Sequence, residues 1–148
     1  MRLGILGTLS IGILLAGQVA LAETVKIGFV TTLTGGAGAI GNDMRDAVEL
    51  ALDHLGRKMG NSDVKMFYED DTFKPAVGKQ KTEKLVKKDK VHFVTGYIWS
   101  HVLMASRNSV VGKGPFMITS NAGPGPVAGK LCHEDFFSTS WQNDQTTM

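Results

Sequence analysis

The chain has 148 residues, and its 16 lysines and arginines nearly balance its 14 aspartates and glutamates, so the formal net charge at pH 7 is +2. This balance gives no electrostatic basis for nucleic acid or anionic lipid as the main partner. The one cysteine, Cys132, cannot form an internal disulfide or by itself a zinc site, and the four histidines lack metal-ligand spacing. We therefore expect no metal, no cofactor and no nucleic acid partner.

The N-terminus has the three parts of a secretory signal. Arg2 is the only charged residue before Glu23, an apolar run follows it, and Ala20-Leu21-Ala22 resembles a signal peptidase site. The pattern predicts cleavage after Ala22, export, and no membrane insertion of the mature chain. An uncleaved membrane anchor is the alternative, because residues 3–22 carry no charge, although several glycines and polar residues dilute their hydrophobicity.

After residue 22, short β-branched runs alternate with segments of helical periodicity. Strands are predicted at Val25–Val30, Val64–Glu69, Val91–Thr95, Phe116–Thr119 and, more briefly, Phe136–Thr139. Helices are predicted from a cap at Asn42 or Asp43 to about Leu55, from Pro75 to about Lys88, and from about Ser100 to Val111. This order predicts an α/β fold, a parallel sheet with helices on both faces joined by right-handed crossovers. A further helix begins near Asn143 or Asp144, so we interpret residues 23–148 as a truncated lobe.

A glycine-rich loop follows the first predicted strand. Its segment Gly36–Gly41 fits the G-x-G-x-x-G pattern of dinucleotide-binding proteins. The first glycine, however, comes about six residues after the strand, too late for a tight phosphate turn, and the acidic pair Glu69-Asp70 lies too far downstream. We expect a ligand-facing or flexible loop here rather than a nucleotide site.

Four segments resemble the branched-chain-amino-acid-type (leucine/isoleucine/valine-binding-like) family of periplasmic binding proteins. They are VKIGFVTTLTGGAGAIGNDMRDAVELALDHL (25–55), YEDDTFKP (68–75), KVHFVTGYIWSHV (90–102) and PFMITSNAGP (115–124). The resemblance implies a type I (Venus-flytrap) fold in which two lobes enclose an amino acid, an amide or a small aromatic acid. It also implies a periplasmic location, delivery of the ligand to ABC permease subunits, and no enzymatic activity, with this chain covering lobe one only.

The resemblance carries the family's ligand contacts to three loops. Ser100 matches a hydroxyl that contacts the ligand carboxylate, and the loop after the fourth strand offers backbone amides. In that loop Gly123 replaces a hydroxyl, which puts an ordinary α-amino acid in doubt. The expected ligand-binding residues are Ile40, Tyr97, Trp99, Ser100, Asn121, Ala122 and Gly123. Ligands of parallel sheets bind beyond the carboxyl ends of the strands, and all three loops lie there.

Each of these residues also has a purely structural interpretation. Ser100 can cap the helix that follows it, and Tyr97 and Trp99 can pack against the lobe. Asp70-Asp71 is more typical of a turn and helix entry than of a cation site. The lysines from Lys79 to Lys90 are more typical of a solvated helix face than of a docking surface.

The pattern predicts binding without chemistry. A ligand-sensing receptor or regulator with the same fold is the alternative function, and an enzyme is a third. Because Gly123 leaves free space and Tyr97 and Trp99 add flat apolar surface, the sequence favours an aromatic or bulky carboxylate over leucine or valine.

Export is directly testable at the predicted cleavage site. N-terminal sequencing of the periplasmic protein is expected to begin at Glu23. Recovery of intact Met1 in the membrane fraction would reject cleavage.

Overall fold

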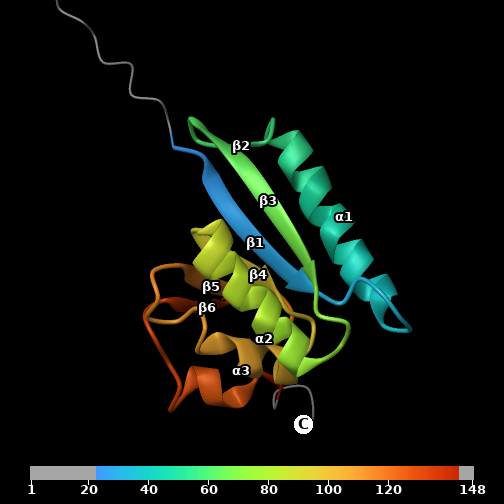
Figure 1. The fold of residues 1–148 in the computed structure, drawn as a ribbon, viewed down its shortest axis with the longest axis vertical. Helices are drawn as coiled ribbons and strands as arrows, with labels where there is room; N and C mark the ends of the chain where they lie inside the picture. The colour runs from blue at the N-terminus through green and yellow to red at the C-terminus, as the bar shows by residue number, and fades with distance from the viewer. Residues whose placement is uncertain (1–22, 144–148) are drawn as a thin grey trace, which may run out of the picture.

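The computed structural model describes residues 23–143, which form one six-stranded sheet with helices packed against it (Figure 1). The strands are β1 (Val25–Thr31), β2 (Lys58–Met59), β3 (Ser62–Asp70), β4 (Phe93–Gly96), β5 (Phe116–Thr119) and β6 (Phe136–Ser138). The helical elements are α1 (Gly38–His54), α2 (Pro75–Lys84), the π-helical turn η1 (Leu85–Asp89), α3 (Ser100–Arg107) and the 3₁₀ turn η2 (Gly125–Ala128). The predicted signal peptide, residues 1–22, and most of the predicted last helix, residues 144–148, lie outside the described residues.

The predicted parallel sheet is confirmed, with the strand order β2-β3-β1-β4-β5-β6. β1 pairs in parallel with β3 on one side and with β4 on the other, whereas β2 pairs antiparallel with β3. The chain leaves β1 toward one edge of the sheet, and from β3 onward every connection leads toward the other edge. Because crossovers between parallel strands are right-handed, this reversal places α1 on one face and α2 and α3 on the other.

Neighbouring residues of β1 show the two faces directly. Any side chain at Gly28 would collide with Leu85 of η1, so this position faces the α2 layer. Phe29 points the opposite way and packs its ring against Tyr68, whose hydroxyl donates to Glu49 of α1. Alternation along β1 therefore sends consecutive side chains to different helices.

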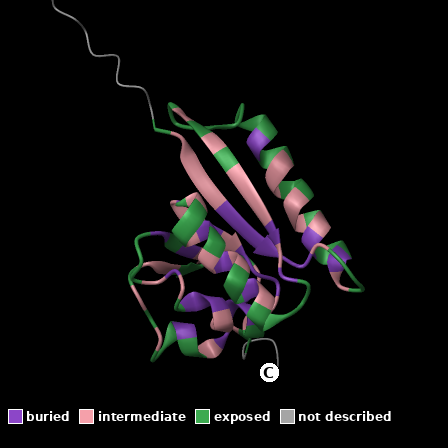
Figure 2. Cartoon of the chain, in the orientation of Figure 1, coloured by how far each residue is buried: buried purple, intermediate pink, exposed green. Residues whose placement is uncertain are grey.

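The main core lies between the sheet and the layer formed by α2, η1 and α3. Figure 2 shows buried segments both in the sheet and in the helices in front of it. The fully buried aliphatic members of this core are Val30, Leu85, Val94, Val102, Leu103, Val110 and Met117. Gly78 of α2 has no room for a side chain, because Val102 of α3 occupies that space. This close approach of the two helices seals the core beside the carboxyl ends of the strands.

The predicted start of α1 is wrong. The helix begins at Gly38 with Ala37 as its N-cap, five residues before Asn42 and six before Asp43, the two expected caps. The Asn42 side chain instead donates to the carbonyls of Leu33 and Gly38 at 3.0 and 2.8 Å. Glycine at position 41 lets the first turn lie directly against the Thr32 carbonyl, so the helix starts early.

Other boundaries differ less. β5 matches the prediction residue for residue, and α2 starts at Pro75 as expected, continuing through the π-helical turn to Asp89. α3 ends at Arg107 rather than Val111, because the chain continues as hydrogen-bonded turns. The hairpin strand β2 and the turn η2 were not predicted.

One half of the sheet face on the α1 side is left bare. Phe93, Phe116 and Phe137 stack side by side across β4, β5 and β6 with ring centroids 6.0 and 6.1 Å apart. Phe116 and Phe137 are 41% and 51% exposed. Beside them Ile27, Met59, Phe93, Thr95 and Ile118 line a hollow of about 160 Å³. A parallel sheet normally has both faces covered, so this face is an unusual apolar surface.

Phe116 and Met117 are matched probes of the two faces, since they are neighbours in β5 with opposite exposure. In residues 23–148, which we expect to be only marginally stable alone, Met117→Ala leaves a core cavity worth about 2–5 kcal/mol and is therefore expected to unfold the lobe. Phe116→Ala is expected to cost less than about 1 kcal/mol. Urea unfolding measures both, and equal costs would show that the Phe116 face is covered after all.

The same bare face leads us to expect that residues 23–148 alone are marginally stable, lack high-affinity ligand binding and bind the dye ANS. A cooperative thermal transition together with micromolar ligand affinity for this fragment would contradict that expectation.

Candidate ligand-binding site

The reversal of strand order at β1 creates a candidate site between the carboxyl ends of β1 and β4. Strand order changes direction there, so the loops that leave the two strands diverge to opposite faces. Such a switch point is where open parallel sheets usually form a ligand-binding crevice. One loop runs from Thr32 to Ala37 into α1, and the other runs from Tyr97 to Trp99 into α3. The loops after β3 and β5 flank them.

Ser100 lies at the start of α3, at the edge of this crevice. The N-cap is Trp99, no side chain caps the helix, and the first turn carries no acidic residue. The Ser100 hydroxyl therefore does not cap α3. It instead accepts a hydrogen bond of 2.8 Å from the side-chain amide of Asn143. A hydroxyl that accepts one bond retains its own hydrogen to donate. That hydrogen and the helix N-terminus suit a carboxylate.

Trp99 is held in place by a chain of hydrogen bonds. Its indole Nε1 donates to the Thr32 hydroxyl at 3.0 Å, and Thr32 donates to the buried carboxylate of Asp71 at 2.5 Å. This chain joins the loops after β1, β3 and β4. The rings of Phe73 and His101 lie beside Trp99, with centroids 4.7 and 6.4 Å away. Sequence reasoning missed Phe73 and His101.

Asp70 ties the loop after β1 to the loop after β3. It accepts hydrogen bonds from the Leu33 and Thr72 amides and, at 2.5 Å, from the Thr34 hydroxyl. Burial alone raises the pKa of Asp70, but these hydrogen bonds outweigh it and hold the pKa below the usual 3.8. The predicted turn role of Asp70-Asp71 is thus confirmed, and residues 23–143 contain no group of three or more potential metal-ligating side chains.

Tyr97 does not belong to the ligand surface. Its side chain is fully buried beneath the loop and shares a hydrogen bond of 2.6 Å with the Thr82 hydroxyl of α2. Burial raises the pKa of the Tyr97 hydroxyl, which therefore stays neutral. The expectation that Tyr97 adds flat apolar surface to the site is therefore wrong, since its ring is buried beneath a backbone with a positive φ of 56°.

The loop after β5 is occupied largely by the chain itself. The Ala122 amide donates to the Tyr97 carbonyl at 3.1 Å, and the Asn121 side chain donates to the Ile98 carbonyl at 3.3 Å. The space beside Gly123 is filled by the Trp141 backbone, so the expectation of free volume there is wrong. Close backbone approach, rather than ligand size, explains this glycine.

The remaining candidate, Ile40, lies in the first turn of α1 and is 46% exposed. The glycine-rich loop before it closes on its own strand: side chains at Gly38 and Gly41 would meet the Leu33 and Thr32 carbonyls. These glycines therefore allow the first turn of α1 to lie against the end of β1.

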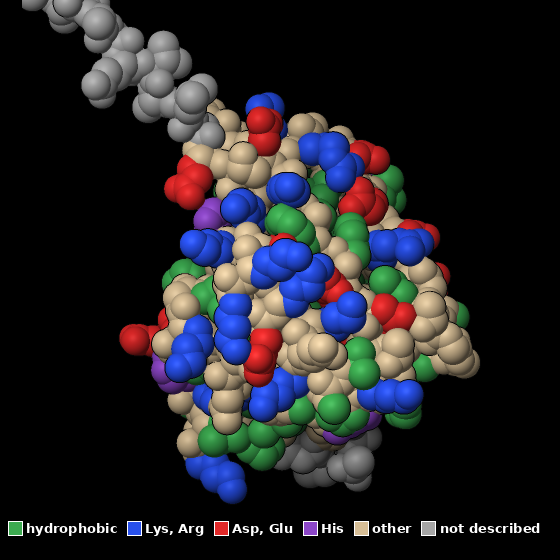
Figure 3. Space-filling model, in the orientation of Figure 1, with side chains coloured by type: hydrophobic (Ala, Val, Ile, Leu, Met, Phe, Trp, Pro, Cys, Tyr) green, Lys and Arg blue, Asp and Glu red, His purple; other side chains and the backbone are tan. Residues whose placement is uncertain are grey.

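The lysine-rich helix is a solvated face, as predicted. Lysines and arginines gather on the surface that α2 and η1 present in Figure 3, and Lys79, Lys84, Lys87, Lys88 and Lys90 are exposed. Lys81 and Lys84 form ion pairs with Glu69 of β3, the former at 2.9 Å. Burial raises the pKa of Glu69, but the hydrogen bonds from both lysines outweigh it and lower the pKa.

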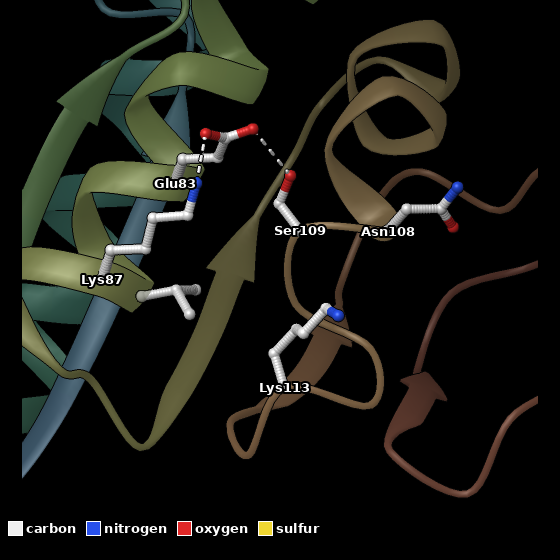
Figure 4. A pocket seen from close by; sticks show the side chains of 6 residues that line it. Glu83, Lys87, Asn108, Ser109 and Lys113 are labelled. Atoms are coloured by element: carbon white, nitrogen blue, oxygen red, sulfur yellow. Dashed lines mark hydrogen bonds and ion pairs between the residues drawn. The ribbon is translucent and has the colours of Figure 1, made fainter.

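A pocket of about 470 Å³ lies away from the candidate site (Figure 4). Its walls come from the last turn of α2, from η1 and from the segment after α3. The pocket therefore lies near the amino ends of the strands. Glu83 there pairs with Lys87 at 2.8 Å and accepts a bond from Ser109 at 3.4 Å. These contacts give Glu83 and Lys87 a role in joining α2 to the segment after α3 and to η1.

The chain belongs to the periplasmic binding protein family, whose sequence profile matches residues 24–148. Family membership implies a periplasmic location. Leu/Ile/Val-binding protein BraC3 of Rhizobium johnstonii is 29% identical over 100 residues, which are 66% of this chain and 27% of that protein. Leu/Ile/Val-binding protein homolog 6 of Brucella abortus is 23% identical over 125 residues, covering 72% and 32%. The chain thus spans less than a third of the length of these relatives.

Solved structures agree on the type I fold. An ABC transporter substrate-binding protein from Sphaerobacter thermophilus is 30% identical with a TM-score of 0.77, covering 83% of this chain and 34% of that one. A solute-binding protein from R. palustris in complex with benzoate is 26% identical with a TM-score of 0.78, covering 82% and 34%. The protein LivJ of Streptococcus pneumoniae, in complex with isoleucine, shares the fold at 22% identity and a TM-score of 0.73, covering 80% and 34%. None of the helices within residues 23–143 has the length and apolar character needed to cross a membrane.

The acid stability of the lobe tests the role of Asp70. Because the folded-state pKa of Asp70 is lowered, its stabilising contribution is complete above pH 3.8 and is lost as the pH falls through the lower folded value. Asp70→Asn is expected to cost about 1–3 kcal/mol at pH 7 and much less near pH 2. Urea unfolding across this range measures the difference.

Asp63→Asn is the control, since Asp63 is exposed and pairs with Lys58 across the β2–β3 hairpin. A loss that is the same at every pH, or absent at pH 7, would contradict the assigned role of Asp70.

Proposed function

We propose that this chain provides the first ligand-binding lobe of the substrate-binding component of an ABC importer. The protein captures a small carboxylate in the periplasm, after removal of residues 1–22, and delivers it to the permease subunits. The observation that carries the proposal is the position of Ser100, which opens α3 at the switch point of the sheet.

Binding of the carboxylate uses the start of α3. The first amides of a helix lack intrahelical partners, and the helix dipole favours negative charge there. Val102 and Leu103 donate back to the Trp99 carbonyl, which closes the first turn and aligns the preceding amides. The Ser100 hydroxyl accepts a hydrogen bond from the side-chain amide of Asn143 and donates its own hydrogen to the ligand. Asn121 braces this arrangement through its bond to the Ile98 carbonyl.

Closure of the site involves the segment that follows β6. The Ser140 hydroxyl donates to the Asn121 carbonyl at 2.9 Å, and the backbone N–H of Asn143 donates to the Gly123 carbonyl at 2.8 Å. This segment leads the chain away from the sheet at the edge of the site, where the connection to a second lobe is placed in our proposal. Hinge closure of that lobe over the ligand then presents the closed form to the permease.

The relatives support a carboxylate and two ligand classes. Proteins named for leucine, isoleucine and valine are similar in sequence, and the benzoate complex from R. palustris is similar in structure. Both classes carry a carboxylate, and they differ in the group attached to it. We therefore assign the carboxylate to Ser100 and α3, and the choice between ring and aliphatic chain to the residues around Trp99.

Calorimetry on the complete protein with benzoate and with leucine tests the assignment. Ser100→Ala is expected to weaken binding of the preferred ligand by about 10- to 100-fold, the usual worth of a hydrogen bond to a charged group. Ser109→Ala is the matched control, because Ser109 follows the end of α3 and lies in the pocket away from the site. This variant is expected to bind the ligand normally.

Failure of both ligands to bind below millimolar concentrations would contradict the proposal, as would an unchanged affinity in Ser100→Ala. Deletion of the gene is expected to abolish uptake of the bound ligand, and intact uptake with altered gene expression would favour a sensor instead.

A further inference from the structure

We propose that Phe73, Trp99 and His101 form an aromatic subsite that takes the planar ring of a ring-bearing carboxylate, and that Asp71 and Thr32 position it. The inference rests on the proposed function, because it specifies the ligand class of the same site. It replaces the earlier grounds for an aromatic ligand, since Tyr97 is buried and the space at Gly123 is filled.

The three rings come from two loops and meet at one edge of the site. Phe73 lies edge-on to Trp99, with ring centroids 4.7 Å apart and an interplanar angle of 81°. It meets His101 in the same way, at 5.1 Å and 87°. The Phe73 ring therefore bridges the two residues that flank Ser100 in the chain. A ligand held by Ser100 through its carboxylate is next to this cluster.

Phe73 is 47% exposed even though it packs against two other rings. A half-exposed phenyl group loses apolar burial, and the lobe's own core gains nothing from that exposed face. Edge-to-face contacts with Trp99 leave ring surface available for one more aromatic partner, and such rings prefer offset or edge-on contacts to one another. A planar ring fits this cluster better than a branched aliphatic side chain.

Asp71 fixes the position of both main rings. One carboxylate oxygen accepts from the Thr32 hydroxyl at 2.5 Å and from the Phe73 amide at 2.8 Å. Thr32 in turn accepts from the Trp99 indole at 3.0 Å. Asp71 therefore sets the Phe73 backbone directly and the Trp99 ring through one hydroxyl.

The cost of this arrangement argues that it is more than packing. Asp71 is fully buried, and its second oxygen, Oδ2, has no hydrogen-bond partner in the described part of the chain. A buried carboxyl group without full hydrogen bonding is unfavourable. Thr72 and Phe73 also adopt left-handed φ angles of 51° and 64°, which are strained for such side chains. With this backbone the Phe73 ring lies against Trp99 and remains partly exposed.

The positioning role is measured first without any ligand. In the complete protein, Trp141 and any tryptophan beyond Met148 are replaced by phenylalanine, so that the fluorescence reports the surroundings of Trp99 alone. Thr32→Val keeps the shape of the side chain but removes its hydroxyl. We expect acrylamide quenching of Trp99 to rise about twofold or more, with loss of its near-ultraviolet circular dichroism, because the indole is no longer held.

Thr82→Val is the matched control, since Thr82 is also a buried threonine but bonds to Tyr97 and Gly78. It is expected to leave the Trp99 signal unchanged. Equal signals in Thr32→Val and the parent protein would overturn the positioning role whatever the ligand is.

The subsite is measured next by calorimetry of the complete protein with benzoate and leucine. Phe73→Leu is expected to weaken benzoate binding about three- to tenfold, the worth of one lost aromatic contact, and to change leucine binding less than about twofold. Equal losses for both ligands, or unchanged benzoate binding, would overturn the subsite. If Ser100→Ala still weakens binding about 10- to 100-fold in that case, the proposed function stands and only the aromatic subsite fails.

Discussion

The reversal of strand order at β1 is the constraint on which the rest of the structure depends. Because β1 pairs with β3 and β4, its two neighbours lead to helices on opposite faces, and the loops between them diverge. That divergence opens the crevice where α3 begins. The same topology requires tight contacts below the crevice, which explains Gly28 beneath Leu85 and Gly41 beneath Thr32. Site and core are therefore consequences of one arrangement of the sheet.

A buried polar network then gives the crevice its shape. Asp70 joins the loops after β1 and β3 from the solvent side, and Asp71 joins the loops after β1, β3 and β4 from the inside. Hydrogen bonds between loops hold side chains more precisely than apolar packing alone, because each bond depends on direction as well as distance. The ring of Trp99 and the hydroxyl of Ser100 are adjacent in the chain, so a network that fixes one also places the other. Binding without chemistry requires this kind of fixed surface.

Sequence periodicity predicted five of the six strands, because these are short runs of β-branched and aromatic residues, as in β5, where the bounds agree. It misplaced the start of α1, since Asn42 resembles a cap but the glycines allow an earlier turn against Leu33. It kept Trp99 and Ser100 but wrongly placed the Tyr97 ring at the site, because tertiary packing and the bond to Thr82 decide where that ring lies. Phe73 was missed for the same reason: its left-handed φ and its bond to Asp71 depend on tertiary contacts. The paired aspartates before it were the one available signal.

The central claim is that a ligand carboxylate binds at the start of α3 with its attached group against Trp99. A crystal structure of the complete protein grown with benzoate measures this most directly. The account predicts a carboxylate oxygen within hydrogen-bonding distance, about 3 Å, of the Ser100 hydroxyl, and the ring beside Trp99 and Phe73. A ligand bound elsewhere, or a carboxylate that does not contact Ser100, would contradict it.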